Sequence, residues 1–80
     1  MRLDDFLSTV GVIKRRTLAK EISQKGQVEV NGRKAKPAYQ VKENDVILLK
    51  GNDSRALEVI AIPTGSVSKE RREDFFKIIS

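Results

Sequence analysis

The side chains best suited to a chemical task in this chain are the lysines and arginines that crowd positions 14 to 50. Ten of the 16 basic residues lie there with only four acidic ones, so this segment carries a net charge of +6, and the remaining residues carry −1. Lysine and arginine gather in this way where phosphate groups must be neutralised. The pattern indicates a polyanion-binding face, with nucleic acid as the expected ligand.

Residues that usually catalyse reactions or bind metals are scarce. The chain has no cysteine and no histidine, which excludes cysteine nucleophiles, histidine general bases and Cys/His zinc sites. The acidic residues near the chain ends are accompanied by no glycine-rich phosphate loop. We therefore expect a protein that is not an enzyme and that requires neither a cofactor nor a metal.

Length and composition indicate one small domain. Eighty residues are too few for two independent cores. No apolar run approaches the roughly 20 residues that span a bilayer, and the N-terminus is charged where a signal peptide would be apolar. A cysteine-free chain is compatible with the reducing cytosol. We expect a cytoplasmic monomer that has no contact with a membrane.

Two helices are expected to position the first cations. A stripe at helical spacing predicts a short helix that ends at Gly11, and its members are Leu3, Phe6, Leu7 and Val10. A second helix is expected from Lys14 to about Gln24, because Gly26 lies just past its end. Its inward-facing residues are expected to be Leu18, Ala19 and Ile22.

A small sheet is expected to follow. Val28 and Val30 alternate with polar residues, and Asn31-Gly32 predicts a type I′ hairpin turn whose return arm, residues 33–36, is cut short by Pro37. Further strands are expected at 46–49, after a turn at 43–45, and at 57–62, after a turn at 51–53. Ser68 is a candidate N-cap for a final helix over residues 69–79, with Phe75 and Phe76 packed on the sheet or exposed for a protein contact. This order indicates an α+β fold with a mostly antiparallel sheet.

Several residues, at these spacings, resemble the S4 RNA-binding domain family. The matching motifs are Arg2-Leu3-Asp4-x-Phe6-Leu7, Lys14-Arg15-Arg16-x-x-Ala19, Gly26-x-Val28-x-Val30-Asn31-Gly32, Lys34, Lys36-Pro37 and Asp45. The resemblance covers residues 1–50, so residues 51–80 would complete the same single domain with a strand and a C-terminal helix. It implies an L-shaped arrangement of two helices and a hairpin, whose concave basic face binds structured RNA.

The resemblance also implies which residues contact RNA. Carried over to this sequence, the contact set is Arg2, Lys14, Arg15, Arg16, Lys20, Asn31, Lys34 and Lys36, and Arg33 joins it because the positive charge continues along the hairpin. For Asn31 the stronger interpretation is a role in the turn, and for Asp4 a local pairing with an arginine. Many family members have a serine cap before the second helix, and Lys14 in that place leaves the helix without an obvious side-chain cap.

Among stand-alone members of the family, the resemblance is strongest to those that act in ribosome-associated quality control and in heat shock. It implies a non-catalytic factor that docks on ribosomal RNA and tRNA of stalled large subunits during alanine tailing, with a tailing factor as a further partner. Four aromatic residues are too few for a broad stacking surface, so folded RNA read by shape and charge is expected. Three alternatives stay open: a targeting module of an RNA-modifying enzyme, a ribosome-assembly factor and a DNA-binding regulator.

Overall fold

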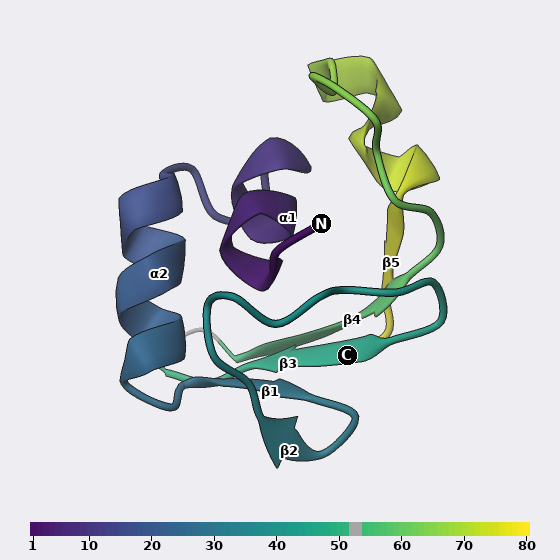
Figure 1. Cartoon of the computed structure of the whole chain (residues 1–80). Helices are drawn as coiled ribbons and strands as arrows, with labels where there is room; N and C mark the ends of the chain where they lie inside the picture. Colours follow the sequence, from purple (N-terminus) through teal and green to yellow (C-terminus); the bar gives the residue numbers. More distant parts are fainter. Residues whose placement is uncertain (52–53) are drawn as a thin grey trace.

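The computed structural model describes residues 1–51 and 54–80. Within these residues, the helices α1 (Leu3–Thr9) and α2 (Arg16–Gln24) lie on one side of a five-stranded antiparallel sheet (Figure 1). The strands are β1 (Val28–Val30), β2 (Arg33–Lys34), β3 (Val46–Leu49), β4 (Arg55–Val59) and β5 (Phe76–Ile78), in the spatial order β2-β1-β3-β4-β5. A 3₁₀ helix, η1 (Lys69–Asp74), precedes β5. The α+β fold class is confirmed, and no helix in this part of the chain is long and apolar enough to cross a membrane.

The core lies between α1 and the inner face of the sheet. The predicted stripe of α1 is fully buried, and it meets the inward side chains of the strands, which include Val28, Ile47, Leu57 and Val59. Burying a side chain of this size contributes about 1.5–3 kcal/mol. The helix ends where expected, because Gly11 takes a φ of +77° that a residue with a Cβ rarely adopts.

Helix α2 packs on α1 through a narrower face than the sequence indicated. Ala19 and Ser23 are buried at the centre of this face, and the Ser23 hydroxyl donates a hydrogen bond to the Ala19 carbonyl (2.8 Å). The prediction that Leu18 faces inward is wrong, since Leu18 is 47% exposed. Successive helical residues point about 100° apart, so Leu18 is carried to the flank while Ala19 takes the contact. Helix α2 begins at Arg16, two residues later than the predicted start at Lys14, and its N-cap is Arg15. The expected lack of a side-chain cap is confirmed.

The hairpin has the predicted turn. Asn31 and Gly32 have φ values of +53° and +84°, the left-handed pair that a type I′ turn needs, and they set the register Val30↔Arg33. The predicted turn at 51–53 includes two residues outside the described part. Strand β4 ends at Val59, so the expectation that the strand continues to residue 62 is wrong.

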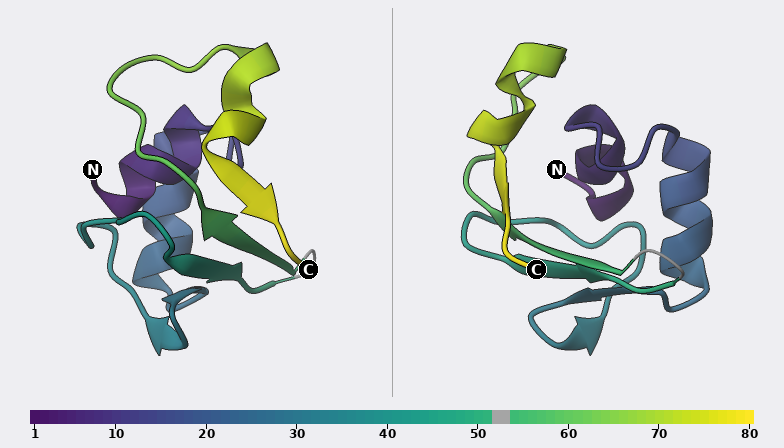
Figure 2. Two further views of the ribbon diagram at one scale, coloured as in Figure 1. Left: turned by 90° about the vertical axis from the view of Figure 1, so that its right-hand side faces the viewer. Right: turned by 180° about the vertical axis from the view of Figure 1, so that it is seen from behind.

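The C-terminal segment differs from the predicted helix over 69–79. Only residues 69–74 are helical, as a 3₁₀ turn, and residues 76–78 form β5 beside β4 (Figure 2). The register places Phe76 opposite Val59 and Ile78 opposite Leu57. Apolar residues at 75, 76, 78 and 79 suit either a helix or a strand. The strand is favoured because its pairing with β4 covers the otherwise open edge of that strand. Phe75 and Phe76 are partly buried against the core.

Candidate nucleic-acid interface

A buried carboxylate joins the starts of the two helices. Asp4 is 1% exposed, and the Arg2 guanidinium donates to both of its oxygens, from Nε to Oδ1 at 3.1 Å and from Nη2 to Oδ2 at 3.2 Å. Arg16, at the start of α2, approaches Asp4 Oδ2 at 3.7 Å and pairs with Asp5 Oδ1 at 3.1 Å. The expected pairing of Asp4 with an arginine is confirmed. The two arginines stay 41% and 54% exposed, so they are held in place with donors free for a further anion.

These arginines border a depression of about 300 Å³. Arg2, just before α1, and Asp4, in its first turn, line one side, while Arg16, Thr17 and Lys20 line it from α2. Among the described residues, Lys20 has no carboxylate partner. Three cations around one depression are suited to binding a phosphate group. Thr17 is a lining residue that the sequence interpretation missed because no motif marks it.

The hairpin adds further cations beneath the C-terminal end of α2 (Figure 1). Arg33 and Lys34 form β2, and Lys36 follows it; all three are exposed and none has an ion-pair partner in residues 1–51 and 54–80. The Lys34 side chain lies over Gly26, where an added Cβ would be 3.3 Å from Lys34 Cδ. The missing side chain at Gly26 therefore lets the hairpin approach the end of α2.

A second buried carboxylate fixes the hairpin. Asp45, 7% exposed, accepts hydrogen bonds from Asn31 Nδ2 (3.0 Å), the Tyr39 hydroxyl (2.9 Å) and the Lys42 backbone N–H (2.9 Å). Asn31 Oδ1 in turn accepts from the backbone N–H of Val46 (3.0 Å). Burial raises the pKa of Tyr39, and the hydrogen bond to Asp45 and its negative charge raise it further. The turn role of Asn31 is confirmed, and its RNA contact stays a prediction.

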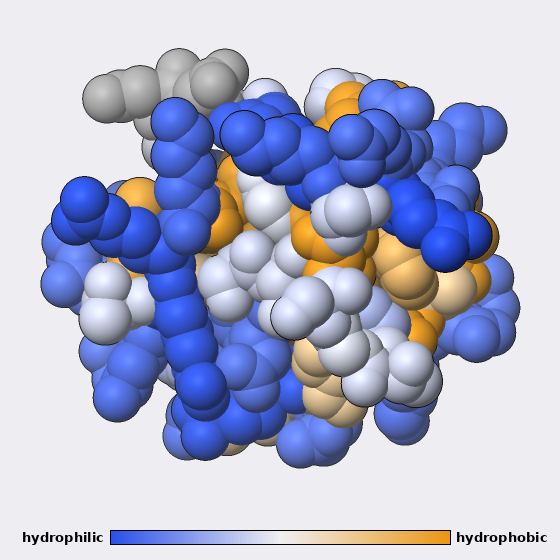
Figure 3. Space-filling model, turned by 90° about the horizontal axis from the view of Figure 1, so that it is seen from above, coloured by the Kyte–Doolittle hydropathy of each residue, from blue (hydrophilic) through white to orange (hydrophobic). Residues whose placement is uncertain are grey.

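The remaining predicted cations lie before α2. Lys14 and Arg15 are exposed in the segment between the helices, without a carboxylate partner in the described residues. Seen from above, hydrophilic side chains dominate the α2 side of the molecule, at the left of Figure 3, with apolar atoms between them. The exposed Leu18 belongs to this side. The predicted set thus divides into a group at the helix starts and a group on the hairpin.

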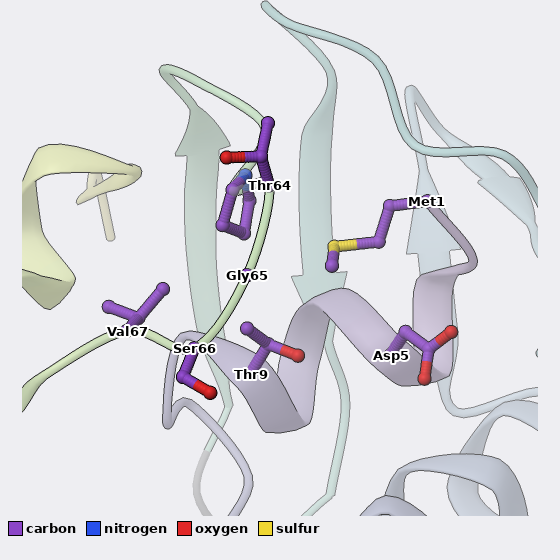
Figure 4. Close-up of a pocket in the computed structure, with 8 residues that line it drawn as sticks. Met1, Asp5, Thr9, Thr64, Gly65, Ser66 and Val67 are labelled. Atoms are coloured by element: carbon purple, nitrogen blue, oxygen red, sulfur yellow. The ribbon is translucent and has the colours of Figure 1, made fainter.

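A further hollow, of about 560 Å³, lies outside the basic surface. It opens between α1 and residues 63–67, and the Met1 side chain extends toward that segment (Figure 4). Of the side chains that line it, only the carboxylate of Asp5 is charged. A hollow with this lining does not attract phosphate, so it does not extend the interface.

The comparisons with known proteins bear on the family and the fold. Residues 1–47 match the family model described as S4 domain. An RQC P-site tRNA stabilizing factor from Streptococcus pneumoniae is 38% identical over 80 residues, which cover 100% of this chain and 91% of that protein. Heat shock protein 15 from Escherichia coli is 40% identical over 63 residues, 78% of this chain and 47% of that one. The trimeric structure of heat shock protein 15 from Vibrio cholerae is similar, with a TM-score of 0.90 at 26% identity, covering 100% of this chain and 82% of that chain.

Proposed function

The chain belongs to the S4 domain family, and from this premise we propose that it is a non-catalytic RNA-binding factor of ribosome-associated quality control. The observation that carries the proposal is the pair of arginines held by Asp4 beside Lys20, which has no carboxylate partner among the described residues. A guanidinium already fixed by a buried carboxylate loses little conformational entropy when it binds a phosphate. The similarity to a P-site tRNA stabilizing factor, over 91% of that protein, supports the ribosomal setting.

In this proposal the protein acts by holding RNA in place and catalyses no reaction. It docks as a monomer on ribosomal RNA and tRNA of a stalled large subunit in the cytoplasm, through the groups at the helix starts and on the hairpin. Holding the tRNA in one place would assist alanine tailing of the nascent chain by a separate tailing factor. The contact residues are Arg2, Lys14, Arg15, Arg16, Lys20, Asn31, Arg33, Lys34 and Lys36.

Sedimentation of ribosomes with the tagged protein tests the setting, with RNA crosslinking in the same fractions. We expect co-migration with free large subunits that carry peptidyl-tRNA, and crosslinks to both ribosomal RNA and tRNA. Migration with small subunits or precursor particles would instead support an assembly factor. Absence from all ribosomal fractions would refute the quality-control role.

The salt dependence of RNA binding tests the surface itself. Replacing Lys20 with alanine should weaken binding to a structured RNA and reduce the slope of log K against log salt by about 0.7–0.9, the value of one phosphate contact. Lys20 is more informative than Arg16, because Arg16 also pairs with Asp4 and Asp5 inside the protein. Lys77→Ala is the matched control, since Lys77 is an exposed cation on β5, far along the sheet from the hairpin. Equal slopes for the two variants would contradict the assignment of this surface.

A further inference from the structure

A hollow of about 400 Å³ opens beside the hairpin, separate from the depression at the helix starts. Its lining has an apolar part, formed by Val30, Ala35 and Tyr39, and a polar part, formed by Asn31, Arg33 and Lys34. The volume lies within the roughly 300–1,000 Å³ of small-molecule sites, and the mixture of apolar wall and polar rim is typical of them. A ligand that fits this lining has a flat apolar portion beside an anionic one.

The Tyr39 side chain is held firmly in this wall. Its hydroxyl donates to Asp45, its backbone N–H donates to the Lys36 carbonyl (3.0 Å), and its carbonyl accepts from the Leu3 N–H (2.8 Å). It is the single tyrosine of a chain without tryptophan. The three phenylalanines, in contrast, pack in or against the core. Tyr39 is therefore a pre-positioned aromatic side chain next to the basic surface, where a nucleobase could pack on it at low entropic cost.

The charge around the hollow favours a ligand that carries phosphate. Arg33 and Lys34 are exposed at its rim and have no carboxylate partner in the described residues. The carboxylate that Tyr39 contacts, that of Asp45, already accepts three hydrogen bonds. The rim therefore presents net positive charge next to the aromatic wall.

We propose that this hollow takes one unpaired nucleotide of a folded RNA, with its base against Tyr39 and its phosphate bound by Arg33 and Lys34. The inference rests on the proposed RNA-binding function and narrows its ligand. The groups at the helix starts bind the phosphates of a paired region by charge, and the hairpin hollow selects an RNA from which a single base projects. Selection acts on the presence of the unpaired base, because every base has a face that can stack.

Two RNA hairpins test the proposal: one is fully paired, and the other differs only by a single bulged adenosine. The wild-type protein should bind the bulged hairpin about 5-fold to 150-fold more tightly, the range produced by stacking one base on one aromatic side chain. Tyr39→Leu keeps an apolar side chain and removes the ring, so the ratio of its affinities for the two hairpins should fall to within about twofold. Phe75→Leu, the control, removes an aromatic ring outside the hollow and should keep the preference for the bulged hairpin.

A second measurement uses the wild-type protein alone, so it remains decisive even if Tyr39→Leu fails to fold. Because the chain has one tyrosine, ¹³C-labelled tyrosine gives a single set of ring resonances in the NMR spectrum. These resonances should shift with the bulged hairpin and stay in place with the paired one.

The outcomes separate this proposal from the one on which it rests. Salt-dependent binding of both hairpins with equal affinity, or an unchanged Tyr39 spectrum, would overturn the nucleotide site and leave the RNA-binding surface standing. A bulge preference that survives in Tyr39→Leu would also overturn it. Failure to bind either hairpin would overturn both proposals.

Discussion

Replacing Asp45 with alanine should destabilise the fold severely, because one nearly buried carboxylate accepts three hydrogen bonds from separate parts of the chain. The donors are Asn31 in the hairpin turn, Tyr39 in the following loop, and the backbone of Lys42. A hydrogen bond to a charged group contributes about 1.5–3 kcal/mol. Water can reach some of the released donors, so we expect a loss of about 3–5 kcal/mol in the free energy of unfolding. A domain of this size has only about 4–12 kcal/mol in total.

Urea denaturation followed by circular dichroism measures this loss, with the free energy extrapolated linearly to water. The matched control is Glu43→Ala, which removes an exposed carboxylate from the same turn and should change the stability by less than about 0.5 kcal/mol. A loss below about 1 kcal/mol for Asp45→Ala would refute the reasoning. That result would mean that the three donors find other partners when the carboxylate is absent.

Two further predictions concern a glycine and a titration. Gly11→Ala should lower the free energy of unfolding by about 1–2 kcal/mol in a thermal or urea melt, because Gly11 has a positive φ and its new Cβ would overlap the Arg72 side chain. Gly65→Ala is the control: Gly65 has open space around it, so this change should be nearly neutral. The raised pKa of Tyr39 means that the folded state favours the neutral phenol, so its contribution to stability is complete below the unfolded pKa of about 10 and is lost as the pH rises through the folded pKa. A urea series at increasing alkaline pH should show this decline in the wild type and a smaller one in Tyr39→Phe, and equal declines would contradict the role of the Tyr39–Asp45 hydrogen bond.

The features that the sequence predicted correctly depend on neighbouring residues. Asn31-Gly32 specifies its turn because two consecutive positive φ values suit few other residue pairs. Gly11 ends its helix for a similar reason. The charge imbalance of residues 14–50 is visible without any structure, and it predicted where unpaired cations gather.

The features that the sequence did not predict depend on contacts between distant segments. The apolar spacing at Phe76 and Ile78 fits a helix or a strand, and the decision comes from β4, which needs a partner at its edge. Leu18 lies on the flank of α2 because Ala19, one position further, makes the close approach to α1. The bond between Tyr39 and Asp45 could have been suspected from the acid that follows the turn, but no spacing rule gives its partner.

At the uncapped start of α2, the charges that favour RNA binding do not favour the stability of the helix. The free N–H groups at a helix start form the positive end of its dipole, where cations are unfavourable, yet Lys14, Arg15 and Arg16 stand there without a capping side chain or an acid in the first turn. Asp4 and Asp5 neutralise Arg16 in part. Lys14 and Arg15, in contrast, have no carboxylate partner in the described residues, so a bound phosphate backbone would offset their repulsion with the helix start. Added salt should therefore have two opposite effects. It should stabilise the isolated domain by screening the repulsion at the start of α2, and it should lower the affinity for RNA. An acidic residue in the first turn of α2 would stabilise the helix start and would also lower the positive charge of the binding surface.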